Sequence, residues 1–536
     1  MKEKLMNIVK NALIQSGINE QNKPIIIEKT KDNSHGDYAC NIAMQLAGVL
    51  KKNPREIATT LISSMKDECI DHIEIAGPGF INFFLNKNYL FDNIVTVLKE
   101  KENYGKVNIG KKEPIIIEYV SANPTGFLHI GHARGAAYGD ALSRIQSFAG
   151  YKVTRQYYVN DAGNQINNLG ISINARYHEL YNIPMEIPEG GYVGKEIKEI
   201  ALDIQKEYGD SKLDAELSFF KEIGIKALLK KIETDLNAFR VPFDLWTSEQ
   251  WLYDTGRVSK VLEELKKGNE TYTEDNALWL KTENYGDEKN RVLVKNDGTY
   301  TYFLPDIAGH LYKYELGNRK CIDVFGADHH GYINRLKAAL QIFGHDPDSL
   351  DIKICQMVRM VKDGKEVKMS KRTGNAYTLN DLMEEVGVDA ARYFFAEKSL
   401  DTQMDFDLDL ATQKSNDNPV YYIQYAYVRI ASILKQKEIK ELSKFETIES
   451  EYALNLLSKV YEFKDAVTLA SMKNAPHIIA NYAYSLATAF HTFYAHEKVL
   501  TEDEKYSMER LNLIQAVAYT LKNALELIGV GIRTEM

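Results

Sequence analysis

The chain has 536 residues, of which 44% are hydrophobic and 26% are charged, and its formal net charge is −9. This composition is ordinary for a globular protein, so it excludes collagen-like, low-complexity and disordered chains. The length predicts roughly three or four domains with an ample core.

Cysteine usage and the first residues indicate a compartment. The four cysteines, Cys40, Cys69, Cys321 and Cys355, include no CxxC pair, so we expect neither a disulfide framework nor a zinc knuckle. The N-terminal segment carries apolar residues at helical spacing, which predicts an amphipathic helix and not a signal peptide. No stretch is long and apolar enough to span a bilayer. We therefore expect a cytoplasmic protein without a membrane partner.

Residues 1 to about 105 predict an appended α/β domain. They contain helix-like stretches and the strand-like run Ile81 to Leu85. A doubly wound α/β domain is predicted next, over residues 110 to 385. It is interrupted by an insertion between about 180 and 290 that is rich in Glu, Lys and Leu at helical spacing.

The string His129 to His132 (HIGH) follows a predicted buried strand, Pro114 to Val120, and a short loop. Helical spacing from Leu128 onward places the string at a helix N-terminus, where an α/β fold binds phosphates. Gly131 lets a ring or ribose approach the backbone. The two imidazoles can donate hydrogen bonds to phosphate oxygens as charge develops. Two alternatives are a metal pair, for which no third ligand is placed, and histidines with structural duties only.

A second string, Lys368 to Lys371 (KMSK), follows two short extended runs that an Asp363-Gly364 turn separates. Such a cationic loop can close over a triphosphate and neutralise departing pyrophosphate. The alternative interpretation is a solvated run of charges, which is the usual explanation of such loops.

Residues 400 to 536 predict a helical bundle, with long helical patterns such as Tyr421 to Leu434. Tyr421, Tyr422, Tyr425 and Tyr427 offer stacking faces for unpaired bases, although tyrosines at this spacing are more often core residues. The net charge of −9 argues against a nucleic-acid partner, but local lysine clusters can form basic patches on an acidic whole.

In this order, the two strings resemble the signature of class I aminoacyl-tRNA synthetases. The stretch Glu118 to His132 (EYVSANPTGFLHIGH) resembles the arginyl-tRNA synthetase version of the first motif. Five other stretches are similar to that family, so the resemblance covers essentially the whole chain: Ala76 to Phe83, Tyr158 to Gln165, Asp297 to Ala308, Gly326 to Tyr332 and Tyr421 to Ala426.

The resemblance implies that ATP and L-arginine form arginyl-adenylate, from which tRNA(Arg) takes the arginyl group. It assigns catalysis to His129, His132, Lys368 and Lys371, the last of which some members have lost. Mg²⁺ is expected with ATP and no zinc or other metal ligand set is expected. The N-terminal domain is expected to touch the tRNA elbow, the helical domain is expected to bind the anticodon through Tyr421 and Tyr425, and the protein is expected to be a monomer.

Substrate contacts follow from the same resemblance. Tyr302 and Asp306 are expected to hold the guanidinium, which is planar and always charged and so needs carboxylate acceptors. The alternative for Asp306 is an ordinary helix N-cap. The remaining arginine-binding candidates are Glu118, Ser121, Asn123 and His329, and the ATP-binding candidates are Gly131, Gly326, Asp328, Met357, Val358 and Ser370.

Three rival functions stay open. A smaller-substrate nucleotidyltransferase shares the HIGH-type loop but has no need of the helical C-terminal domain. A non-catalytic RNA-binding relative would be expected to lose its active site, whereas both strings are whole. Another amino-acid specificity within the class is opposed only by the pocket carboxylates and the appended N-terminal domain.

Overall fold

A computed structural model describes the chain except for residues 19–22, 31–32, 368–376 and 536. Its N-terminal unit packs helices against an antiparallel sheet with the strand order β1-β2-β4-β3. Ile81, Phe83 and Leu85 alternate along β4 and point into the core. The elements are α1 (Lys2–Gln15), β1 (Ile27–Lys29), β2 (Tyr38–Cys40), α2 (Ile42–Leu50), α3 (Pro54–Ile62), β3 (Ile70–Ala76) and β4 (Phe80–Leu85).

Five parallel strands form the centre of the molecule, in the order β12-β11-β5-β6-β7. The chain builds outward from β5 through β6 to β7 and then adds β11 and β12 on the other side of β5. The topological switch point therefore lies between β5 and β11, where such sheets bind ligands. The strands are β5 (Pro114–Glu118), β6 (Lys152–Val159), β7 (Leu245–Ser248), β11 (Lys320–Gly326) and β12 (Leu350–Cys355).

Helices cover both faces of this sheet because its central strand is apolar on both sides. Ile115 and Ile117 belong to the core that includes α5 (Ile130–Phe148). Ile116, which points the other way, packs in the core that includes α11 (Phe303–Glu315) and α12 (Ile333–Ile342). The predicted doubly wound α/β class is confirmed.

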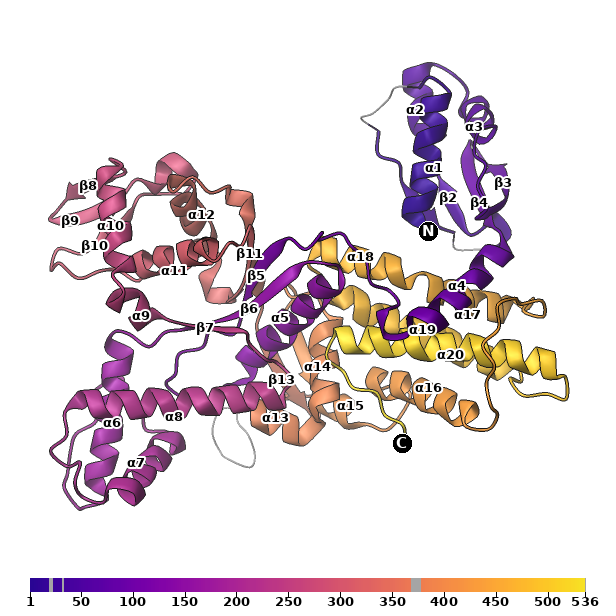
Figure 1. Ribbon diagram of the computed structural model, residues 1–536. Helices are drawn as coiled ribbons and strands as arrows, with labels where there is room; N and C mark the ends of the chain where they lie inside the picture. The colour runs from indigo at the N-terminus through magenta and orange to yellow at the C-terminus, as the bar shows by residue number, and fades with distance from the viewer. Residues whose placement is uncertain (19–22, 31–32, 368–376, 536) are drawn as a thin grey trace.

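Two lobes extend from the sheet on the side away from the N-terminal unit (Figure 1). One contains α6 (Asn164–Glu179), α7 (Lys195–Tyr208) and α8 (Leu217–Ala238). The other contains α9 (Glu249–Asp254), α10 (Arg257–Lys267), β8 (Thr271–Glu274), β9 (Ala277–Leu280) and β10 (Arg291–Val294), with α11 and α12. Strand β7 lies inside the range 180 to 290 that we predicted as an insertion. It hydrogen-bonds along β6, so these four residues belong to the parallel sheet and the range is not one continuous insertion.

A small sheet, β14-β13-β15, follows the central sheet. Asp363 and Gly364 have φ values of 51° and 68°, which is the left-handed turn that an Asp-Gly hairpin favours. The elements are β13 (Val358–Lys362), β14 (Lys365–Glu366), α13 (Leu379–Val386), α14 (Val388–Glu397), β15 (Met404–Asp407) and α15 (Leu408–Thr412).

The C-terminal region is helical, as predicted, and lies opposite the two lobes (Figure 1). Its longest helix is buried along much of its length, and α4 (Lys87–Glu100), which leaves the N-terminal unit, packs against it. None of the helices in the described part of the chain is long and apolar enough to cross a bilayer. The helices are α16 (Pro419–Leu434), α17 (Glu451–Tyr461), α18 (Phe463–Lys473), α19 (His477–His496) and α20 (Glu504–Leu527).

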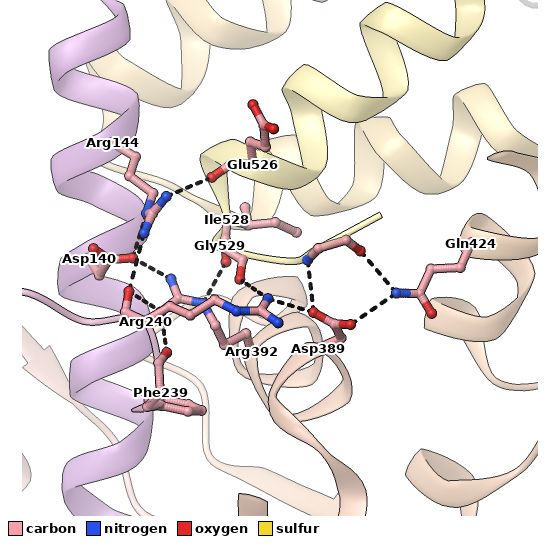
Figure 2. Close-up of polar contacts among 11 residues, drawn as sticks. Asp140, Arg144, Phe239, Arg240, Asp389, Arg392, Gln424, Glu526, Ile528 and Gly529 are labelled. Atoms are coloured by element: carbon pink, nitrogen blue, oxygen red, sulfur yellow. Dashed lines mark hydrogen bonds and ion pairs between the residues drawn. The ribbon is translucent and has the colours of Figure 1, made fainter. Parts of the chain in front are cut away.

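A buried polar network, which we call the C-terminal node, joins this region to α5 (Figure 2). Arg392 of α14 pairs with Asp140 of α5 at 2.5 Å and donates to the carbonyls of Phe239, Arg240 and Ile528. Asp389 accepts from the Arg240 side chain, the Gln424 amide and the Gly531 N–H. The segment after α20 is thereby held against three other parts of the chain.

Candidate active site

The carboxyl end of β5 is strained where it enters the candidate site. Val120 and Ser121 have φ values of 69° and 39°, which side chains other than glycine rarely adopt. The turn lets the Ser121 hydroxyl donate to Glu118 Oε1 at 3.0 Å and accept from the Tyr158 N–H at 3.1 Å. These bonds stabilise a turn that the backbone alone would disfavour.

The HIGH histidines cap the N-terminus of α5. His129 is the N-cap, and its Nδ1 accepts from the Gly131 N–H at 3.1 Å. His132 Nδ1 accepts from the His129 N–H at 3.3 Å, and the centroids of the two imidazole rings are 3.8 Å apart. Because each Nδ1 is an acceptor, each neutral ring carries its proton on Nε2. Both rings therefore present Nε2–H donors at a helix N-terminus.

Both imidazoles are held neutral. Partial burial lowers the pKa of His129, and burial together with the neighbouring His129 ring lowers the pKa of His132 to about 3. At neutral pH they act as hydrogen-bond donors and contribute no full charge, so phosphate neutralisation needs other groups.

The HIGH segment is tied to the chain that leaves the KMSK string. The Ile130 N–H donates to the Tyr377 carbonyl at 3.2 Å, and the Leu379 N–H donates to the Leu128 carbonyl at 2.8 Å. His129 and Thr378 form an antiparallel bridge. Lys368, Ser370 and Lys371 themselves lie outside the described residues, but the chain emerges from their segment directly beside the HIGH helix.

A cavity of about 500 Å³ opens at the switch point, between the ends of β5, β6 and β11. It brings together parts of the chain more than 200 residues apart in sequence. Six of the predicted substrate-binding residues line it: Glu118, Ser121, Asn123, Tyr302, Asp306 and Gly326. Asn123, which is exposed, donates to Gln165 Oε1 at 2.6 Å. Tyr302 is the N-cap residue of α11, and 71% of its surface is exposed.

Two carboxyl groups from different helices, Asp306 and Glu249, line this cavity. Asp306 lies in the first turn of α11 and accepts from the Tyr332 hydroxyl at 2.5 Å. Glu249 lies at the start of α9 and contacts the Tyr158 hydroxyl at 3.4 Å. Burial and the nearby charges of Asp306 and Asp161 raise the pKa of Glu249 to about 7. Two carboxyl groups in one cavity give it a negative potential, which favours a cationic ligand.

Glu118 has a different environment from the one we expected. Its Oε2 pairs at 2.6 Å with Lys313, which is buried and also contacts Asp323 at 2.7 Å. Burial opposes the charge on Lys313, but Asp323 and Glu118 outweigh it and raise its pKa above the usual value. Burial would raise the pKa of Asp323, yet Lys313 and His310 lower it to about 2. Glu118 therefore already has a cationic partner.

Comparison with known proteins fits this geometry. Residues 93–431 match the family model "tRNA synthetases class I (R), catalytic domain", residues 423–536 match the DALR anticodon binding domain, and residues 3–85 match the arginyl tRNA synthetase N terminal domain. The chain is 50% identical to arginine–tRNA ligase 1 of Halalkalibacterium halodurans over 99% of this chain and 98% of that one. It is 49% identical to arginine–tRNA ligase of Bacillus subtilis over 100% and 99%. The chain belongs to the arginyl-tRNA synthetase family.

The family predicted from the motifs is thereby confirmed. A structure of Thermus thermophilus arginyl-tRNA synthetase superposes with a TM-score of 0.79, with full coverage of both chains and 20% identity, which supports the fold.

The adenosine candidates of this family member lie at the ends of β11 and β12. Gly326 lines the cavity and pairs in register with Cys355. Met357, whose side chain is 74% exposed, and Val358 follow β12 at the same edge. Asp328 and His329 lie in a short 3₁₀ helix beyond Gly326, but their side chains are outside the described part of the structure.

Tyr421 and Tyr425 share one face of α16. Their rings stack with centroids 6.1 Å apart, and Arg429 lies over Tyr425 and over Tyr494 of α19 at 4.5 and 4.6 Å. The two tyrosines are half-buried, so part of each ring faces solvent. A cation among aromatic faces is a surface on which unpaired bases can stack.

Sequence reasoning missed Glu249, Tyr332 and Lys313. Glu249 follows β7 directly, and a carboxylate at the carboxyl end of a parallel strand is a signal that could have found it. Lys313 could not be found in this way, because a lysine on a helix normally faces solvent and its burial depends on β11.

Proposed function

We propose that the chain carries out ATP-dependent ligation of L-arginine to its tRNA, with the guanidinium held between Asp306 and Glu249. Membership of the arginyl-tRNA synthetase family supports the reaction. The observation that carries the site assignment is the placement of two carboxyl groups, Asp306 and Glu249, in one cavity at the switch point of the sheet.

The guanidinium fits this pocket because its donors lie in a plane and need acceptors on two sides. Asp306 would accept on one side, oriented by Tyr332, and Glu249 on the other. Tyr302 would cover the guanidinium. Glu118, paired with Lys313, would fix Ser121 and so the strained turn, while Ser121, Asn123 and His329 would serve the α-amino and carboxyl end.

In the first step an oxygen of the arginine carboxylate attacks the α-phosphorus of ATP, and the bond to pyrophosphate breaks. His129 and His132 would donate Nε2–H to the phosphate oxygens, with Gly131 allowing close approach. Lys368 and Lys371 would neutralise the departing pyrophosphate, with Ser370 beside them. Mg²⁺ would accompany ATP, held mainly by phosphates and water.

Adenosine would lie at the ends of β11 and β12. Gly326 and Asp328 would contact the ribose, and the backbone of Met357 and Val358 would read the adenine edge. In the second step the terminal ribose 2′-hydroxyl of tRNA(Arg) attacks the arginyl carbonyl and AMP leaves. Tyr421 and Tyr425 would contact the anticodon loop, and the N-terminal part, up to about residue 105, the tRNA elbow. The protein would act as a monomer in the cytoplasm.

The test is attachment of each radiolabelled amino acid to total tRNA by the purified chain. Arginine alone is expected to be attached. Asp306→Asn should raise the arginine KM by about 100-fold, because it removes a charged acceptor from a cation. Asp297→Asn, which changes a carboxylate in an exposed turn, is the matched control and should act like the wild type. Attachment of another amino acid would refute the pocket assignment and leave the fold intact.

A further inference from the structure

A buried arginine lies behind the HIGH histidines. Arg134 is on α5, two residues after His132, so it points about 200° around the helix from that histidine. Its side chain is fully buried, with 0% exposed. Within the described residues no carboxylate forms an ion pair with it. Burying a cation costs free energy unless its donors are hydrogen-bonded.

The Arg134 guanidinium binds two backbone carbonyls from distant parts of the chain. Nη1 donates to the Gln356 carbonyl at 3.0 Å, and Nη2 donates to the Ser399 carbonyl at 2.8 Å. The same two segments are joined by the Gln356 N–H, which donates to the Leu400 carbonyl at 3.1 Å. Arg134 therefore fixes the junction between β12 and β13 against α5.

This junction carries the backbone that faces adenine in the proposed site. The Gln356 carbonyl and the Met357 N–H belong to one planar peptide unit and point in opposite directions. A donor that holds the carbonyl therefore sets the direction of the N–H. It also polarises the peptide, which strengthens the N–H as a donor.

We propose that Arg134 is a positioning residue for ATP, which fixes the Met357 backbone relative to the phosphate-binding histidines at the other side of α5. This inference rests on the proposed function, because it takes the end of β12 as the adenine site. Arg134 lies on the other face of α5 from the histidines and is not among the residues that line the arginine cavity. Its loss should therefore act on ATP and spare arginine.

The experiment compares equilibrium binding of ATP alone and of arginine alone to the full-length wild type, Arg134→Met and Arg134→Lys. Arg134→Met should weaken ATP binding about tenfold and change arginine binding less than about twofold. Arg134→Lys keeps the charge but lacks the planar guanidinium that reaches two carbonyls. Its ATP affinity should therefore lie between those of the wild type and Arg134→Met.

Arg144→Gln is the matched control. Arg144 is on the same helix and also donates to two distant carbonyls, those of Arg240 and Glu526, but these lie in the C-terminal node. It should lower the melting temperature, as Arg134→Met does, and leave ATP affinity unchanged.

Equal weakening of ATP and arginine binding, or wild-type ATP affinity in a folded variant, would overturn the proposal. If Arg134→Met does not fold, the ATP affinity of Arg134→Lys is compared with that of Arg144→Gln, and a weaker affinity in Arg134→Lys alone supports the proposal. Arginine attachment by the wild type is measured on the same preparation. If it is absent, the proposed function fails, whereas the ATP comparison still decides the role of Arg134.

Discussion

Arg392 and Asp140 form an ion pair in which both side chains are fully buried, and the pair joins α14 to α5 (Figure 2). Burial lowers the pKa of Arg392, but Asp140 offsets part of this effect and the guanidinium stays charged. Asp140 also accepts from Arg144 at 2.6 Å. The helix that begins with the HIGH histidines is therefore anchored at its middle by the C-terminal node.

Breaking this pair should destabilise the protein strongly. Arg392→Met leaves the Asp140 carboxylate buried with one partner fewer, which costs about 3–5 kcal/mol. The unfolding midpoint measured by circular dichroism should fall by about 3–4 °C. Arg359→Met is the control, because Arg359 pairs with Asp405 on the surface and such pairs contribute about 0–1 kcal/mol. Equal falls in the unfolding midpoint for the two substitutions would show that the buried pair contributes no more to stability than the surface pair.

Gly529 is required by the same network. A Cβ at this position would come within 2.2 Å of the Arg392 guanidinium, and its φ is +69°. Gly529→Ala should therefore displace the chain after α20, in addition to the strain of about 1 kcal/mol that alanine has in this conformation. Gly256→Ala, at φ +71° in open space, isolates the strain alone. We expect a clearly larger fall in the unfolding midpoint for Gly529→Ala, and similar falls would show that the contact is unimportant.

Arginine binding should weaken as pH falls below about 7. With its pKa raised to about 7, Glu249 is protonated in the empty pocket below that pH, and a neutral carboxyl cannot pair with a guanidinium. Binding must then release a proton, so the arginine Kd should rise by about tenfold between pH 8 and pH 6. Isothermal titration calorimetry in buffers of different ionisation enthalpy measures the arginine Kd and the number of protons released on binding. Glu249→Gln should bind arginine weakly and without this pH dependence. A wild-type Kd that does not change with pH would exclude pairing of Glu249 with the guanidinium.

His132→Ala should slow adenylate formation by about 100-fold with the fold intact, because it removes an Nε2–H donor from the phosphate site. His132→Gln should recover part of the rate, since its amide can donate from a similar place. With its pKa lowered to about 3, His132 should cause no inflection in the wild-type rate between pH 5.5 and 8.5. Pyrophosphate exchange measured across that range at saturating arginine, where protonation of Glu249 does not limit binding, checks this. A rate near that of the wild type for His132→Ala would refute the assignment.

Tyr332→Phe should raise the arginine KM by roughly 10- to 100-fold without changing the far-UV circular dichroism. The Tyr332 hydroxyl donates to Asp306 and orients that carboxylate toward the cavity. Losing one such hydrogen bond to a charged group costs about 1.5–3 kcal/mol. Tyr314→Phe, which removes a hydroxyl bonded to Ser349 away from the cavity, is the control and should leave the KM unchanged.

Local sequence patterns predicted the elements that carry the site. The apolar run at Ile115 to Ile117, the helix after His129 and the turn at Asp363 were predictable because each depends on neighbours in the chain. Glu249 and Lys313 were not, because their roles arise from contacts between segments far apart in sequence. The same is true of Asp140 and Arg392, which are 252 residues apart. The position of the KMSK residues stays a prediction.

The two hydrogen bonds between Leu128–Ile130 and Tyr377–Leu379 have a consequence for the KMSK lysines. Tyr377 is six residues after Lys371 in the sequence, and its carbonyl is fixed on the first turn of the HIGH helix. In the proposed reaction, the cations that would neutralise pyrophosphate therefore belong to a segment whose C-terminal end is fixed beside the histidines that would bind the triphosphate.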